Sequence, residues 1–280
     1  MKLVGVVGSG IMGSGIAEVV AKAEIDVVIR SRTQETADAT KAAIQNNLNK
    51  QVAKSKITQD QLEEVMKRIS VTDKLEDLSG CDLVIESAVE DLETKKQLFT
   101  QLDKVVNQNC VLASNTSTLP VIDLARSTNR PDKVCGIHFF NPAVLMSLVE
   151  VVRPITASDE TIALANDFVK TCGKDAVQVV DRAGFIVNAL LFPYLNNAIA
   201  MFEAKTASME DIDVAMKGGC NFPMGPFALL DLVGLDTTVA ILNALHAEFK
   251  SPELEPRPML KKLVSEGKLG RKTKQGFYSY

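Results

Sequence analysis

The chain of 280 residues is poor in the residue types on which several classes of protein depend. It has no tryptophan, its aromatic residues make up 5%, and its 31 Lys and Arg are outnumbered by 35 Asp and Glu, which gives a formal net charge of −4. Surfaces that bind nucleic acid or anionic lipid need clustered cations, and single strands also need stacking rings. We therefore expect neither nucleic acid nor a membrane as a partner.

Histidine and paired cysteines are equally scarce. The two histidines are His138 and His246, and none of the five cysteines has a second one at C-x-x-C spacing. Structural zinc sites and redox pairs rely on such clusters. We therefore expect no bound metal, and we interpret the cysteines as buried free thiols in a reducing compartment.

Long apolar runs are missing, although 46% of the residues are hydrophobic. The first residues, "MKLVGVVGSG", reach a glycine turn after a run that is too short for a signal peptide. No other run approaches the length of about 20 residues that spans a bilayer. We expect a cytoplasmic protein with a substantial core.

Short β-branched runs alternate with helical patterns through residues 1–182. This rhythm predicts an α/β domain with a doubly wound, mostly parallel sheet of the Rossmann type. The expected strands are "KLVGVVG", "IDVVIR", "CDLVIES", "CVLAS", "KVCGIHFF", "LMSLVEVV" and "DAVQVV". The expected helices cover about 11–23, 34–54, 58–68, 92–106 and 159–172.

The pattern of alternating strands and helices ends after Arg182. "AGFIVNALLFPYLNNAIAMFEA" predicts a long apolar helix that Pro193 can kink, and "SMEDIDVAMKGG" has a Ser cap, early acids and a glycine end. "GPFALLDLVGLDTTVAILNALHAEF" and "PMLKKLVSEGKLG" are also helical, and a strand pattern returns only in the tail "GFYSY". Residues 183–280 therefore form a second, all-helical domain.

A glycine-rich turn lies between the first expected strand and the first helix. Its pattern is Gly8-x-Gly10-x-x-Gly13, in the strand–turn–helix context of a dinucleotide-binding turn. The three glycines suit a tight turn, close approach of a pyrophosphate and close packing of the helix on the strand. The helix N-terminus offers backbone N–H groups to the phosphates. The residues predicted to bind the cofactor here are Gly8, Ser9, Gly10, Ile11, Met12 and Gly13.

The stretch "VVIRSRTQ", about 20 residues farther on, bears on which dinucleotide binds. NAD-binding turns usually place an acid here to hold the ribose hydroxyls, whereas this chain has Ser31 and Arg32. A carboxylate would repel the 2′-phosphate of NADP, and a guanidinium binds it with two hydrogen bonds. We therefore favour NADP over NAD as the cofactor, and NAD is the alternative.

His138 lies at the end of an expected strand, where ligands bind in doubly wound folds. Its imidazole titrates near neutral pH and suits a general base. Glu150 follows on the next strand-like stretch and can orient the imidazole. Each residue taken alone has an ordinary structural explanation as well.

Six stretches together resemble the 3-hydroxyacyl-CoA dehydrogenases, and most of all the short bacterial 3-hydroxybutyryl-CoA dehydrogenases. They are "GSGIMGSGIAEVV", "SNTSTL", "IHFFNPAVLMSLVEVV", "GFIVNALL", "FPMGPFALLDLVGLDT" and "KTKQGFYSY", and they occur in the family's order along nearly the whole chain. The resemblance implies interconversion of (S)-3-hydroxybutyryl-CoA and acetoacetyl-CoA with a nicotinamide cofactor, in a homodimer formed through the helical domain.

The same resemblance implies a role for individual residues. His138 is then the base at the 3-hydroxyl and Glu150 orients it, while Ser117 and, from the helical domain, Asn188 hydrogen-bond the substrate. The residues that it assigns to the cofactor are Glu90, Lys95, Ser117, Asn141 and Lys274.

Coenzyme A carries phosphates and needs cations. Lys50 and Lys54 are four residues apart on one helix, and therefore on one face. The pattern alone suits a solvated helix face, and the resemblance implies that these lysines bind the phosphates of an acyl-CoA substrate.

Two other functions remain open at this point. A dehydrogenase of free 3-hydroxy acids, such as 3-hydroxyisobutyrate, has a similar build, but those families use a lysine where this chain has Asn188. A dinucleotide-binding protein without catalysis is the other, and the presence of all four expected catalytic residues argues against it.

Overall fold

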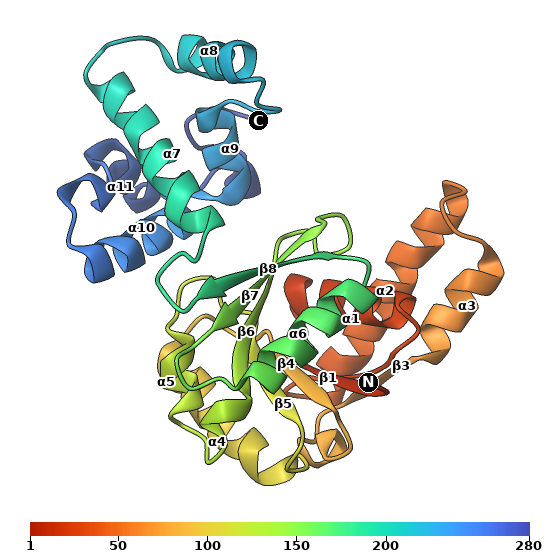
Figure 1. The fold of residues 1–280 in the computed structure, drawn as a ribbon. Helices are drawn as coiled ribbons and strands as arrows, with labels where there is room; N and C mark the ends of the chain where they lie inside the picture. The colour runs from red at the N-terminus through yellow and green to blue at the C-terminus, as the bar shows by residue number, and fades with distance from the viewer. The chain divides into compact units, whose positions relative to one another are not determined.

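A computed structural model describes all 280 residues, which divide into two compact units, Met1–Arg182 and Ala183–Tyr280. The first unit is built on an eight-stranded sheet in the order β3-β2-β1-β4-β5-β6-β7-β8 (Figure 1). The strands are β1 Leu3–Val7, β2 Asp26–Arg30, β3 Ile69–Thr72, β4 Leu83–Glu86, β5 Val111–Ser114, β6 Val134–Phe139, β7 Leu148–Arg153 and β8 Asp175–Val180. The predicted doubly wound sheet is confirmed.

Helices cover both faces of this sheet (Figure 1). They are α1 Ile11–Lys22, α2 Gln34–Ala53, α3 Gln59–Lys67, α4 Leu92–Val105, α5 Val121–Ala125 and α6 Asp159–Thr171, with 3-10 turns η1 Glu76–Leu78 and η2 Pro131–Lys133. Helices α1, α2 and α6 enclose one apolar layer with the sheet, and α4 and α5 lie on the other face (Figure 1). Helices α2, α3, α4 and α6 are capped at their N-termini by the side chains of Thr33, Thr58, Asp91 and Ser158, respectively.

Buried β-branched residues explain why the strands form a parallel sheet. All four residues of β4 and of β5 are buried, as expected where helices cover both faces. Every strand pair is parallel except β6 and β7, which run antiparallel. In that pair His138 lies directly opposite Glu150.

Two short elements were not predicted. Strand β3 has four residues and follows α3 without a glycine or proline between them, and α5 has five residues. Both are shorter than the windows in which periodicity is detectable. Strand β3 nevertheless extends the sheet beyond β2, where it pairs with Val27–Arg30.

The second unit is helical, as predicted. Its elements are α7 Val187–Glu203, α8 Met209–Cys220, α9 Pro226–Val233, α10 Leu235–Phe249, η3 Pro252–Leu254, α11 Pro258–Ser265 and η4 Arg271–Thr273. Helix α7 continues through Pro193, and Ser208 caps α8 by accepting a hydrogen bond from the Asp211 amide at 3.0 Å. Gly234, with φ of 105°, ends α9 and begins α10, so one expected helical stretch becomes two helices bent by 97°.

The C-terminal tail does not form the strand that its sequence suggested. It makes only isolated bridges and is held by Asp231, which is 1% exposed and accepts hydrogen bonds from the amides of Phe277 and Tyr278 at 2.9 and 2.8 Å. No helix taken singly has the length and apolar character needed to cross a membrane, and only the bent pair α9–α10 passes that test when its helices are joined.

Candidate active site

The glycine turn has the geometry that a pyrophosphate requires. A Cβ on Gly13 would lie 2.0 Å from the Gly8 carbonyl oxygen, and a Cβ on Gly8 would lie 2.3 Å from the Ser87 oxygen, so both positions exclude a side chain. A Cβ on Gly10 would meet nothing within 4 Å, which leaves open space in front of the turn. No side chain caps α1, whose first turn therefore presents backbone N–H groups to this space. The turn fits a dinucleotide.

A chain of hydroxyl groups connects the turn to the end of β2. The hydroxyl of Ser31 donates to Ser9 Oγ at 2.8 Å and lies 2.5 Å from Thr36 Oγ1. Ser31 is 4% exposed, whereas the neighbouring Arg32 is exposed. Arg30 turns away, since its Nε donates to the Asp73 carbonyl oxygen at 3.3 Å. The position at which NAD-binding turns usually have an acid is therefore occupied by the neutral Ser31, and the guanidinium of Arg32 follows it.

The two residues predicted to act in proton transfer, His138 and Glu150, lie next to each other at the end of β6. His138 Nδ1 and Glu150 Oε2 are 2.7 Å apart, and the two residues are 5% and 1% exposed. The cause is the sheet itself, because directly opposite residues of an antiparallel pair project to the same face. Phe140 packs on the imidazole with a ring-centroid distance of 4.6 Å. A carboxylate held in this way fixes the tautomer of the ring and stabilises its charged form.

Ser117 lies in the loop that follows β5, and Glu90 holds this loop. Glu90 Oε1 accepts hydrogen bonds from Thr116 Oγ1 at 2.6 Å, from the Ser117 amide at 2.9 Å and from the Thr118 amide at 3.3 Å. Burial raises the pKa of Glu90, but the charge of Lys95 and these hydrogen bonds outweigh it, so that the pKa lies below its usual value. Glu90 is therefore an ionised acceptor that collects the donors of residues 116–118.

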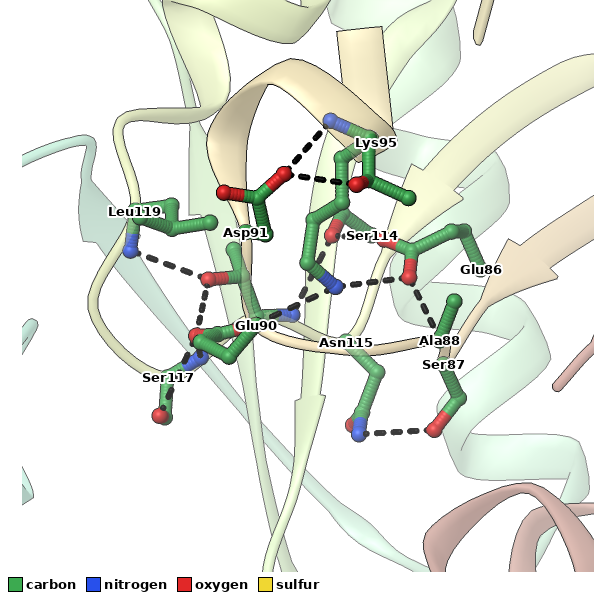
Figure 2. A network of polar contacts seen from close by, with 12 residues as sticks. Glu86, Ser87, Ala88, Glu90, Asp91, Lys95, Ser114, Asn115, Ser117 and Leu119 are labelled. Carbon is green, nitrogen blue, oxygen red and sulfur yellow. Dashed lines mark hydrogen bonds and ion pairs between the residues drawn. The ribbon is translucent and has the colours of Figure 1, made fainter. Parts of the chain in front are cut away.

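Behind Glu90 lies a buried ion pair. Figure 2 shows the Lys95 ammonium between two carboxylates, 2.6 Å from Glu86 Oε1 and 3.2 Å from Glu90 Oε2. Lys95 is 1% exposed and Glu86 is fully buried. Removing one partner from such a pair leaves an uncompensated buried charge, which costs about 3–5 kcal/mol. Glu86 and its neighbours Ser114 and Asn115 were not predicted, because an acid at the end of "CDLVIE" resembles any strand end.

Asn115 joins two of these groups. Its Oδ1 accepts a hydrogen bond from the Phe139 amide at 2.8 Å, next to His138, and its Nδ2 donates to Ser87 Oγ at 3.4 Å (Figure 2). The loops that follow β4 and β5 are thereby fastened to the end of β6. Ser117, Glu90 and Lys95 form one cluster, and His138 with Glu150 forms a second.

The remaining predicted residues lie elsewhere. Asn141 is exposed and precedes a cis proline in the loop after β6. Lys50 is in the last turn of α2, Lys54 follows as its C-cap, and both are exposed. Asn188, 8% exposed in α7, and Lys274, exposed in the tail, belong to the second unit. The roles predicted for these five residues stay predictions.

Comparison with known proteins identifies the family. The sequence model of the 3-hydroxyacyl-CoA dehydrogenase NAD binding domain matches residues 3–182, and that of the C-terminal domain matches residues 184–280. The chain belongs to the 3-hydroxyacyl-CoA dehydrogenase family. It is therefore an oxidoreductase that uses a nicotinamide cofactor, as its sequence predicted.

Individual relatives are similar over their whole length. A 3-hydroxybutyryl-CoA dehydrogenase of Clostridioides difficile is 45% identical over 100% of this chain and 99% of its own. The mitochondrial hydroxyacyl-coenzyme A dehydrogenase of Sus scrofa is 44% identical over 100% of this chain and 91% of its own. The crystal structure of (S)-3-hydroxybutyryl-CoA dehydrogenase PaaH1 from Ralstonia eutropha has a TM-score of 0.97 at 38% identity, covering 100% of this chain and 99% of that one.

Proposed function

We propose that the enzyme interconverts (S)-3-hydroxybutyryl-CoA and acetoacetyl-CoA, and that NADP(H) is its cofactor. The observation that carries the proposal is the pairing of His138 Nδ1 with Glu150 Oε2 at 2.7 Å, at the carboxyl end of β6. The reaction converts an alcohol into a ketone, so it needs a proton acceptor at the oxygen and no attacking nucleophile. Relatives named for this reaction and for hydroxyacyl-CoA oxidation support the thioester substrate.

His138 moves the proton. In oxidation its Nε2 takes the proton of the 3-hydroxyl, and Glu150, bound at Nδ1, stabilises the imidazolium that forms. In reduction the same nitrogen returns the proton to the ketone oxygen. When bound, the nicotinamide supplies the acceptor of the hydride in one direction and its donor in the other.

Ser117 orients the substrate oxygen. Its loop is held by Glu90 through the Ser117 amide, so the position of the hydroxyl is set before the substrate arrives. A group that is already positioned loses little freedom when the substrate binds, which favours reaction from the bound state. In the reverse reaction the hydroxyl stabilises the charge that develops on the oxygen.

The end of β2 supports the preference for NADP. Ser31 brings no charge, so this position does not repel a 2′-phosphate, and Arg32 is exposed next to it. The N-terminus of α2, capped by Thr33, begins immediately afterwards and adds the positive end of a 20-residue helix. Use of NADPH would favour the reductive direction, in which the hydroxyacyl thioester is made.

The test is the loss of nicotinamide absorbance with acetoacetyl-CoA, measured in parallel with NADPH and NADH. We expect turnover with both and a kcat/KM at least about 10-fold higher with NADPH. Equal values would contradict the cofactor preference. Free acetoacetate is the control substrate, and its reduction at a similar rate would contradict the thioester requirement.

A further inference from the structure

We propose that Glu86 is a positioning residue for catalysis, which sets the loop of Ser117 although it touches neither substrate nor cofactor. The inference rests on the proposed function through the role of Ser117. The buried carboxylate of Glu86 lies at the carboxyl end of β4, beside Lys95 and the loops that follow β4 and β5 (Figure 2).

The side-chain hydrogen bonds of Glu86 lead to residues in these loops or next to them. Oε1 accepts from the Ala88 amide at 2.6 Å and from Lys95 Nζ at 2.6 Å, and both donors belong to the β4–α4 segment. Oε2 accepts from Ser114 Oγ at 2.6 Å, at the end of β5. One carboxylate therefore joins two neighbouring strand ends.

Two routes run from Glu86 to the Ser117 loop. The first passes through Ser114, whose Oγ donates to Glu86 and accepts a hydrogen bond from the Thr116 amide at 3.2 Å. The second passes through Lys95, which holds Glu90 Oε2 at 3.2 Å. The other oxygen of Glu90 accepts from the Ser117 amide at 2.9 Å, and also from the Ser117 hydroxyl at 3.3 Å.

The burial of the cluster explains why the routes matter. Lys95, at 1% exposed, needs a carboxylate within reach, and Glu86 provides the shorter contact. Without that charge, Lys95 would be drawn fully to Glu90, and the Glu90 oxygen that holds the loop would shift with it. A displacement of Ser117 by a fraction of an ångström weakens its contact to the substrate oxygen in the transition state.

The experiment is a double-mutant cycle of Glu86→Gln and Ser117→Ala in the full-length enzyme, with acetoacetyl-CoA as the substrate. We expect E86Q to lower kcat about 10- to 100-fold and to change the KM for acetoacetyl-CoA less than about 3-fold. In the S117A background the same change should lower kcat less than about 2-fold, because Glu86 acts through Ser117. Independent, multiplying effects would overturn the proposal.

Hydrogen exchange of the cofactor-free protein gives a readout that needs no substrate. The amides of residues 116–119 should exchange at least about 10-fold faster in E86Q. Asp103→Asn is the matched control, since Asp103 forms a largely buried ion pair with Arg130 at the other end of α4. It should leave both this exchange and kcat unchanged. If E86Q leaves exchange at 116–119 unchanged, Glu86 does not set the loop.

Ser114→Ala keeps the proposal testable should E86Q fold poorly. It removes one hydrogen bond of Glu86 and the link to the Thr116 amide without uncovering a charge. We expect the same pattern with a smaller loss of kcat, about 3- to 10-fold. A wild-type enzyme inactive on acetoacetyl-CoA would refute the proposed function, while the exchange measurement would still decide the role of Glu86.

Discussion

The two halves of the sheet's carboxyl edge differ in chemistry. At the ends of β1 and β2 the structure offers glycines and a neutral chain of hydroxyls formed by Ser9, Ser31 and Thr36. At the ends of β4, β5 and β6 it buries ionisable groups, namely Glu86, Lys95, His138 and Glu150. Backbone and hydroxyls suffice to bind an anion, whereas proton transfer needs charges that are shielded from water.

The difference means that the halves can be altered separately. Changes at β1 and β2 should alter which cofactor binds, and changes at β4 to β6 should alter how fast the bound substrate reacts.

His138→Gln should have the largest effect, because it removes the group that moves the proton. We expect kcat to fall about 10²- to 10⁴-fold, while the dissociation constant of the reduced cofactor, followed by its fluorescence, stays the same. His246→Gln is the control, since that imidazole binds the Ser251 carbonyl oxygen in the second unit, and it should keep full activity. A kcat within about 2-fold of wild type in H138Q would refute the acid–base role.

Ser31→Asp tests the binding half. The new carboxylate would repel a 2′-phosphate and accept the ribose hydroxyls of NADH. We expect the ratio of kcat/KM for NADPH over NADH to fall about 10- to 100-fold, with kcat for NADH nearly unchanged. Ser31→Ala, which removes the hydroxyl without adding charge, should shift the ratio less than about 3-fold. A loss of kcat with both cofactors would show that the halves are not separable.

Lys50→Ala and Lys54→Ala address the end of α2. If these exposed lysines bind the phosphates of coenzyme A, each change should raise the KM for acetoacetyl-CoA about 3- to 10-fold and leave kcat unchanged. A thioester of pantetheine, which lacks the phosphorylated ADP, should show no difference between variant and wild type. Lys67→Ala is the control, because this exposed lysine pairs with Glu64 on α3. An equal rise with both thioesters would argue against phosphate binding.

Glu90→Gln tests the half at the ends of β4 to β6 through stability, where we expect a small shift of the melting temperature that depends on pH. Because the pKa of Glu90 is lowered in the folded protein, its carboxylate stabilises the fold above its ordinary pKa, and this contribution is lost as the pH falls through the folded value. The melting temperature of E90Q should therefore lie about 1–3 °C below wild type at pH 7 and approach it in acid. A difference that is constant from neutral to acidic pH would contradict the assignment.

The binding half was the more predictable one. The glycine turn and Ser31 lie within 24 residues of one another and have fixed spacing, so local sequence was enough to predict both. Strand-end position likewise pointed to His138 as the base and Glu150 as its partner. Glu86 was not predicted, because its partners Lys95 and Ser114 come from other elements. The periodicity of a single sequence does not show which strands are neighbours in the sheet. Breaks such as Gly234 were missed because apolar residues continue on both sides.

The ladder between β6 and β7 has a consequence for how this enzyme can fail. Val149 and Val151, on either side of Glu150, belong to the apolar layer under α1, α2 and α6. A slip of β7 by one position would drive the carboxylate into that layer and turn a valine toward the imidazole. Burying a lone carboxylate among apolar residues is costly, so a chain with β7 out of register would be unstable. Correct folding of this strand and correct pairing of His138 with Glu150 are therefore coupled.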